Sequence, residues 1–238
     1  MDLSTEELKI KTEADAFANE HKDEIAKEAT DINIFLPEVN PVSVFMAGSP
    51  GAGKTESSKN LIKKFSENGR QILRIDPDEL RPQIPGYTGI NSFLFHGAVS
   101  TLVARIHDVA LKHRQSFVLD GTFSKVDMGR ENIERSLKRG RFVQILYVYQ
   151  DPIQAWNFVQ VRELTEGRRI EKEHFIRHYF AARDSVNCLK REFADKIKVD
   201  LLVKNIDGSD QYYKENIDII DNYVPEKYTL ETLNNVLQ

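Results

Sequence analysis

The segment VFMAGSPGAGKTES, residues 44–57, decides the fold of this chain. It contains the pattern G-x-x-x-x-G-K-[ST] in full, with an apolar strand pattern before it and a polar helical pattern after it. Glycines let the backbone bend around an anion with its N–H groups directed inward, and the helix that follows offers its positive N-terminal end. The segment therefore predicts a phosphate-binding loop formed by Gly48, Ser49, Pro50, Gly51, Ala52, Gly53, Lys54 and Thr55.

A loop of this kind binds a nucleoside triphosphate. Lys54 is expected to reach the outer phosphates, and the Thr55 hydroxyl is expected to bind Mg²⁺. The pattern leaves open whether the phosphoryl group passes to water or to an acceptor molecule.

The rest of the chain alternates short apolar runs with segments of helical period. Five runs are typical of buried strands: VSVFMA, QILRI, SFVLD, FVQILYVY and DLLVKN. The helical patterns lie near residues 54–68, 92–114, 127–139, 152–166 and 172–194. Strands and helices that alternate in this way predict an α/β fold with a parallel sheet covered on both faces.

The two ends of the chain have patterns of their own. Residues 4–30 are expected to form one or two helices, with Ser4 and Glu7 as a capping box, before the prolines of LPEVNP interrupt the pattern. The polar tail after Asn205 ends in another helical pattern, YTLETLNNVL. We divide the chain into an N-terminal helical extension, residues 1–40, and a second domain, residues 41–238.

The composition of the chain indicates which classes of partner to expect and where in the cell the protein is located. The formal net charge of −4 over 238 residues argues against nucleic acid as a partner. The N-terminus is charged from the start, and FVQILYVY is too short to cross a bilayer, so we expect no membrane partner and a cytoplasmic location. Cys188 is the only cysteine, and we interpret it as a small, semi-buried residue rather than a catalytic thiol.

Acidic residues follow two of the predicted strands, and the carboxyl ends of parallel strands form the site of such sheets. The second strand runs into RIDPDELRP, where Asp78 is a candidate base for an attacking hydroxyl. For Asp76, capping of a helix and a role in the site are equally favoured. The third strand ends in LDGT, which places Asp120 in the Walker B position for Mg²⁺ and Thr122 within reach of a substrate.

Four arginines follow the fourth strand, in VQVRELTEGRRIEKEHFIRHYF. The fixed fork of a guanidinium suits phosphate oxygens, and we favour this role for Arg162 and Arg168. Arg177 is expected on a solvated face, and the two interpretations are balanced for Arg169. The histidines show no metal-ligand spacing, Trp156 and Phe158 are interpreted as core residues, and KNID has the wrong order for a guanine-reading motif.

Taken together, GSPGAGKT, IDPDELR, a strand ending in DGT and the arginine pair in EGRRI resemble the zeta toxin family over residues 40–205. The IDPDELR element is the more discriminating part of the resemblance, because the loop alone is generic.

The resemblance implies a kinase that phosphorylates the sugar 3′-hydroxyl of UDP-N-acetylglucosamine with ATP or GTP and Mg²⁺, and that is paired with a helical antitoxin. On that pattern Lys54 and Thr55 hold nucleotide and metal, and Asp78 is the base. Arg81 and Thr122 contact the nucleotide sugar together with Asp78 and Asp120. The phosphates are held by Arg162 and Arg168.

The chain departs from the family pattern in three places. Asp120 stands where the family often has Glu, and Phe123-Ser124-Lys125 stands where a further arginine often follows the threonine. The segment NSFLFHGAVSTLVARI lacks the substrate-binding acid expected on that helix. All three departures concern the acceptor side, so another nucleotide sugar or hydroxyl compound stays open as the acceptor.

The sequence thus predicts a P-loop kinase-like three-layer fold with a mainly parallel five-stranded sheet and an N-terminal helical extension. The predicted function is transfer of a γ-phosphoryl group to a nucleotide sugar, in a bacterial toxin. The alternatives are a housekeeping small-molecule or nucleotide kinase and an NTP-driven switch protein. Residues 1–40 either pack on the core, or meet an antitoxin, or form an inhibitory segment.

Overall fold

A computed structural model describes residues 3–66, 69–167 and 169–237. Within these ranges one sheet has six strands in the order β2-β3-β1-β4-β5-β6. The first five are parallel, and β6 runs antiparallel to β5. The strands are β1 (Val42–Ala47), β2 (Leu73–Ile75), β3 (Phe117–Leu119), β4 (Phe142–Tyr149), β5 (Lys198–Lys204) and β6 (Asp210–Lys214).

Apart from the four-residue α3, the helices fall where their patterns predicted them. They are α1 (Thr5–Ala29), α2 (Lys54–Ser66), α3 (Pro77–Leu80), α4 (His96–Lys112), α5 (Val126–Leu137), α6 (Pro152–Glu166), α7 (Lys172–Phe193) and α8 (Leu230–Val236). Short 3₁₀ turns span Arg81–Gln83, Ser92–Phe95, Ala194–Lys196 and Ile220–Asn222. No helix in the described ranges is long and apolar enough to cross a bilayer.

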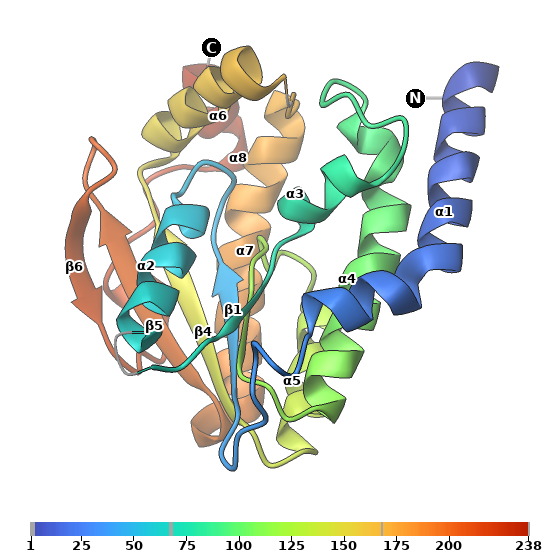
Figure 1. Ribbon diagram of the computed structural model, residues 1–238. Coiled ribbons are helices and arrows are strands. Elements are labelled where there is room, and N and C mark those ends of the chain that lie inside the picture. The colour runs from blue at the N-terminus through green and yellow to red at the C-terminus, as the bar shows by residue number, and fades with distance from the viewer. Residues whose placement is uncertain (1–2, 67–68, 168, 238) are drawn as a thin grey trace.

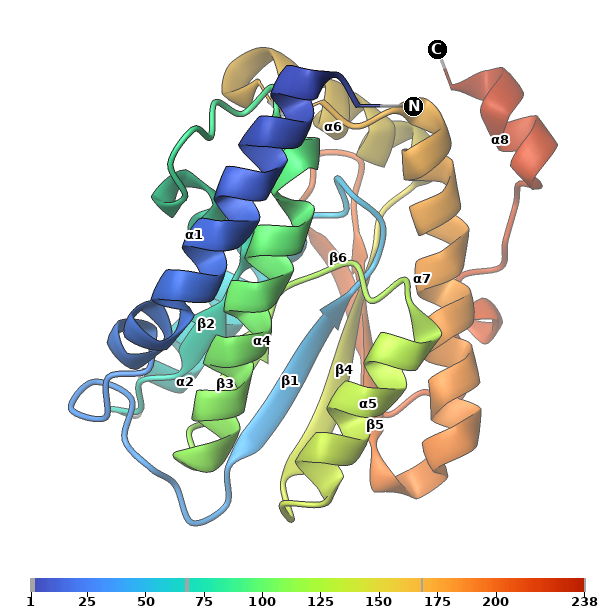
Figure 2. The ribbon, with the colours of Figure 1, turned by 90° about the vertical axis from the view of Figure 1, so that its right-hand side faces the viewer.

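Three layers result, as Figures 1 and 2 show. One face of the sheet packs against α4, α5 and α7 through the larger apolar cluster, which includes Phe45, Tyr147 and Phe175. The opposite face packs against α2 through a smaller cluster around Met46 and Val148. The parallel five-stranded sheet is confirmed, and the edge strand β6 is an addition that the sequence analysis did not predict.

The N-terminal helix α1 lies alongside α4 (Figure 2). Ser4 and Glu7 form the predicted capping box at its start. Its contact face is made of small side chains, since Ala14, Ala18 and Ala26 are almost fully buried. Of the three interpretations of residues 1–40, the structure shows packing on the core.

The C-terminal segment is attached to α7 by a buried arginine. Arg183 Nη1 lies 3.1 Å from Asp221 Oδ1 and 3.3 Å from Glu226 Oε2, and its guanidinium stacks over Tyr149 and Tyr179. These contacts place residues 221–228 against the carboxyl end of β4.

A buried histidine makes the stability of this fold sensitive to acid. His107 is 1% exposed and packs edge-on against Phe117, with ring centroids 4.8 Å apart. Burial, aided by Arg135, Arg141 and Arg139, lowers its pKa from 6.5 to about 3. The unfolded chain therefore takes up a proton as pH falls below 6.5, whereas the folded chain leaves His107 neutral until pH 3.

We expect the free energy of unfolding to fall between pH 7 and pH 5, with His107 contributing about 2 kcal/mol of the loss. His107→Phe keeps an aromatic ring but removes the titration, so its loss over the same interval should be smaller by about that amount. Urea unfolding of both proteins at the two pH values measures the difference. An equal loss in the variant would contradict the assignment.

Candidate active site

The phosphate-binding loop is pressed against the backbone of two neighbouring elements. Gly48, Gly51 and Gly53 have φ values of 134°, 74° and 83°, which favour glycine. A Cβ atom at Gly48 would lie 2.3 Å from the Val148 carbonyl oxygen of β4, and one at Gly51 would lie 2.1 Å from the Ala155 carbonyl oxygen of α6. The loop can therefore take this position only with glycines at both contacts.

Lys54 begins α2 and turns back over the loop. Its Nζ donates to the carbonyl oxygens of Gly48 at 3.0 Å and Ser49 at 2.6 Å. Burial lowers the pKa of Lys54 to about 8, while the negative charge of Asp120 opposes the shift. The charges of Arg162, Asp78 and Asp76 also act on Lys54, so the residues predicted from four separate segments lie around one ammonium group.

Arg74 of β2 joins the acidic residues at the carboxyl ends of β2 and β3. Its Nη2 lies 2.5 Å from Asp76 Oδ2 and 2.7 Å from Asp120 Oδ2, and its Nε donates to Ser58 Oγ at 3.0 Å. Asp76 also caps α3, since its Oδ1 accepts from the Asp78 backbone N–H at 2.8 Å. Burial raises the pKa of Asp76, and Arg74 opposes that shift.

Asp78 lies between two arginines. Its Oδ1 accepts a hydrogen bond from Arg81 Nη1, one turn further along the chain. Its Oδ2 lies 3.5 Å from Arg162 Nη2, and the same nitrogen lies 3.4 Å from Glu166 Oε2. The structure thus brings Asp78, Arg81 and Arg162 together, although they come from α3, the turn after it and α6.

Thr122 belongs to a chain of hydroxyl groups that ends at a histidine. Its Oγ1 lies 3.0 Å from Ser124 Oγ, which lies 2.8 Å from Nδ1 of His178 in α7. The Thr122 carbonyl oxygen accepts from the Gly48 N–H at 3.2 Å, so this loop also contacts the phosphate-binding loop. Phe123, which lies between Thr122 and Ser124 in the sequence, has a φ of 56°, a left-handed conformation that is uncommon for an aromatic residue.

The other predicted residues are placed as follows. Arg168 lies outside the described residues. Arg169 is exposed and lies 3.9 Å from Glu163, and Arg177 is exposed, as the interpretation as a solvated residue required. Trp156 is buried at 8% exposure, whereas Phe158 is half-buried and faces Gly208 in the loop after β5.

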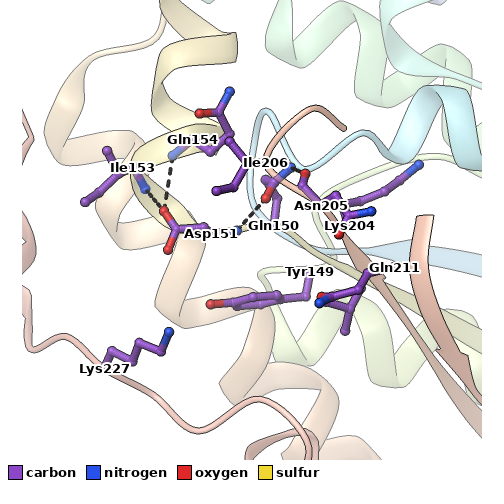
Figure 3. A pocket seen from close by; sticks show the side chains of 11 residues that line it. Tyr149, Gln150, Asp151, Ile153, Gln154, Lys204, Asn205, Ile206, Gln211 and Lys227 are labelled. Atoms are coloured by element: carbon purple, nitrogen blue, oxygen red, sulfur yellow. Dashed lines mark hydrogen bonds between the residues drawn. The ribbon is translucent and has the colours of Figure 1, made fainter. Parts of the chain in front are cut away.

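A pocket of about 570 Å³ opens where β4 and β5 end (Figure 3). The start of α6 lines it with Asp151, Ile153 and Gln154, and Tyr149 and Lys227 lie on its other side. Lys204, which also lines it, reaches the phosphate-binding loop, because its Cε would lie 3.4 Å from a Cβ at Gly53. The pocket is therefore adjacent to the loop.

The oxygen atoms of Thr55 and Asp120 beside the phosphate-binding loop are suitable ligands for Mg²⁺. The Thr55 hydroxyl is half-buried at the start of α2, and Asp120 is 4% exposed. Ser58 and Arg74 both donate to Oδ2 of the Asp120 carboxylate, and among the described residues none donates to Oδ1. A hydroxyl and one carboxylate oxygen, completed by phosphate and water, are the ligands that Mg²⁺ takes.

Three residues of the site were not predicted. Arg74 carried a signal, because a charged residue inside the short apolar run QILRI needs a buried partner. Ser124 and His178 carried none, since 54 positions separate them in the sequence.

Comparison with known proteins gives the family and the fold. A family model described as zeta toxin matches residues 25–218. No curated protein sequence matches the chain significantly.

Solved structures match over most of the chain. The PezAT toxin–antitoxin system of Streptococcus pneumoniae is 15% identical with a TM-score of 0.62, covering 100% of this chain and 89% of that one. The AvrRxo1-ORF1:AvrRxo1-ORF2 complex with sulphate ions is 16% identical with a TM-score of 0.65, covering 86% and 70%. The same complex with ATP has a TM-score of 0.58 at 16% identity, covering 86% and 65%. At these identities the likeness concerns the fold.

Arg74 is expected to stabilise the fold as well as the site. Arg74→Ala leaves two buried carboxylates facing each other, so the free energy of unfolding should fall by about 3 kcal/mol. Arg105→Ala is the matched control, because Arg105 makes an exposed ion pair with Asp23 and its loss should change little. Urea unfolding compares the two. A second change, Asp76→Asn, should recover part of the loss, and equal stability of the two single variants would contradict this account.

Proposed function

The chain belongs to the zeta toxin family, and on that premise we propose that it is a kinase acting as a bacterial toxin. The donor is ATP or GTP with Mg²⁺, and the acceptor is the sugar 3′-hydroxyl of UDP-N-acetylglucosamine or a related nucleotide sugar. The observation that carries the proposal is the convergence of Asp78, Arg162 and Lys54 at the edge of the phosphate-binding loop.

The reaction is an in-line transfer. The acceptor oxygen forms a bond to the γ-phosphorus while the bond from that phosphorus to the bridging oxygen breaks, and the nucleoside diphosphate leaves. The hydroxyl proton passes to the Asp78 carboxylate. Arg81 and Arg162, which hold that carboxylate from two sides, fix its orientation. A loose transition state needs positioning more than a strong base, so a carboxylate held by two cations is adequate.

Positive charge around the phosphates comes from several elements. We assign the outer phosphates to Lys54 of α2 and Arg162 of α6, and, from its sequence pattern alone, to Arg168. When bound, Mg²⁺ neutralises charge on the phosphate oxygens, with Thr55 and Asp120 as its protein ligands. The pocket beside the loop, bordered by Lys204, is the proposed place for the nucleoside part of the donor.

The acceptor side has its own polar groups. Thr122 and Arg81 are the proposed contacts to the nucleotide sugar, together with Asp78 and Asp120. Thr122 is oriented by Ser124 and His178. This chain of hydroxyl groups occupies the segment where the family often has a further arginine, so we propose that Ser124 takes part in holding the acceptor here.

We also propose a division into residues 1–40 and a kinase domain of residues 41–238, and an antitoxin as partner. The PezAT toxin–antitoxin system, which has a similar fold, supports the partner. The packing of α1 along α4 supports the interpretation of residues 1–40 as an extension of the kinase domain.

The acceptor is tested by mass spectrometry of UDP-N-acetylglucosamine after incubation with the protein, ATP and Mg²⁺. We expect the sugar nucleotide to gain one phosphate, and Lys54→Ala, in which the fold stays intact, to abolish the gain. Consumption of ATP with an unmodified sugar nucleotide would refute this acceptor. A rate of phosphate release that no sugar nucleotide changes would indicate a switch protein instead.

The base is tested separately. Asp78→Asn should lower kcat by about 10²–10⁴, the usual contribution of general base catalysis, and leave nucleotide affinity within a few-fold. Isothermal titration with a non-hydrolysable ATP analogue and single-turnover kinetics measure the two quantities. Turnover retained in Asp78→Asn would rule out Asp78 as the base.

A further inference from the structure

A second pocket, of about 330 Å³, lies at the end of the sheet opposite to the phosphate-binding loop. Its lining comes from four segments: Pro41 directly before β1, Leu111 and Lys112 in the last turn of α4, Arg114 after that helix, and Arg139 and Arg141 between α5 and β4. The ends of α4 and α5 and the start of β1 lie together at the lower end of Figure 2. Four of the six are basic and none is acidic.

Arg141 carries a buried charge and makes no ion pair with a described residue, although the charge of Glu38 acts on it. It is 4% exposed. Its Nε donates to Ser43 Oγ at 2.7 Å, and its Nη2 donates to the carbonyl oxygens of Val42 at 2.9 Å and Gln115 at 2.6 Å. All of these acceptors are neutral, and within the described ranges the buried Nη1 has no hydrogen-bond partner. A buried cation in such surroundings is costly unless an anion compensates it.

The other basic side chains add to the same positive field. In the described part of the chain, Lys112, Arg114 and Arg139 make no ion pair. Arg139 Nη1 donates only to the Arg135 carbonyl oxygen, at 3.1 Å, and Arg114 Nε donates to the Glu38 carbonyl oxygen at 3.1 Å. The nearby Glu38 carboxylate lies 3.9 Å from Arg70.

The same positive charges also act on a neighbouring side chain. His107, buried in the adjacent core, is held neutral by burial and by Arg135, Arg141 and Arg139. Of these three, Arg135 makes an ion pair with Asp108, whereas the other two make none with a described residue. The excess of positive charge therefore lies on the residues that line the pocket.

We propose that this pocket binds a small anion that carries a phosphate group. Guanidinium groups match the oxygens of phosphate in geometry, and Arg139 and Lys112 are exposed at the mouth, where they can close on an anion. The volume is large enough for a phosphate with a small organic part. The pocket is separate from the proposed kinase site, so its occupant is neither donor nor acceptor of the transfer.

Inorganic diphosphate is the probe, titrated calorimetrically into full-length protein that carries Lys54→Ala, so that the phosphate-binding loop does not contribute. We expect one binding site. Adding Arg139→Gln should weaken the affinity about tenfold, as should adding Lys112→Gln, because each removes a charged hydrogen bond. Lys138→Gln is the matched control, since Lys138 is adjacent in sequence but does not line the pocket, and it should leave the affinity unchanged.

No binding to the Lys54→Ala protein, or binding that neither Arg139→Gln nor Lys112→Gln weakens, would overturn the proposal and leave ordered water as the partner of Arg141. Parallel titrations with inorganic phosphate and with ribose 5-phosphate distinguish a free anion from one carried by an organic molecule. In the otherwise native protein, Arg139→Gln should leave ATP consumption unchanged. The result is therefore independent of whether the proposed kinase activity is found.

Discussion

The contact between the glycines of the phosphate-binding loop and the carbonyl groups of β4 and α6 is the constraint on which the rest of the site depends. With no room for a side chain at Gly48 or Gly51, the loop fixes how closely α6 approaches the sheet. The position of α6 in turn sets where Arg162 meets Asp78. The Gly48 N–H donates to the Thr122 carbonyl oxygen, so the phosphate-binding loop also fixes the position of the loop after β3.

Buried charge is handled differently at the two ends of the sheet. At the carboxyl ends, Arg74 faces the carboxylates of Asp76 and Asp120, so each buried charge has a partner of opposite sign within the protein. At the amino ends, Arg141 donates to neutral oxygens and lines a pocket with three other basic residues, while the charge of Glu38 acts on it without forming an ion pair. A buried arginine is therefore ion-paired at one end of the sheet, whereas at the other end a buried arginine makes no ion pair with the described residues.

Most of the fold could be predicted from the sequence, because its strands and helices are marked by patterns among neighbouring residues. Buried parallel strands such as FVQILYVY read as continuous apolar runs, and the helices between them begin or end where proline or glycine stands, as at Pro152 and Gly167. The edge strand β6 was missed because all five of its residues, DQYYK, are exposed, so no apolar pattern marks it.

The site was predictable in part for the same reason. Residues at strand ends, such as Asp78 and Asp120, could be assigned to one edge of the sheet from topology alone. The Ser124–His178 contact could not, because it depends on how α7 packs against the loop after β3. Asp76 caps α3, as one of its two interpretations required, and it also pairs with Arg74, whereas its role in the site stays a prediction.

The edge strand β6, which the sequence analysis did not predict, affects how readily the sheets of two molecules can pair at their edges. Without β6, the seven residues of β5 would present unpaired backbone N–H and C=O groups, together with apolar side chains, to any neighbouring chain. Instead the margin of the sheet is a short, polar strand that carries charges at both ends, Asp210 and Lys214. The opposite margin is β2, with only three residues. Both margins are thus poor templates for intermolecular strand addition, which protects the folded chain against aggregation at high concentration.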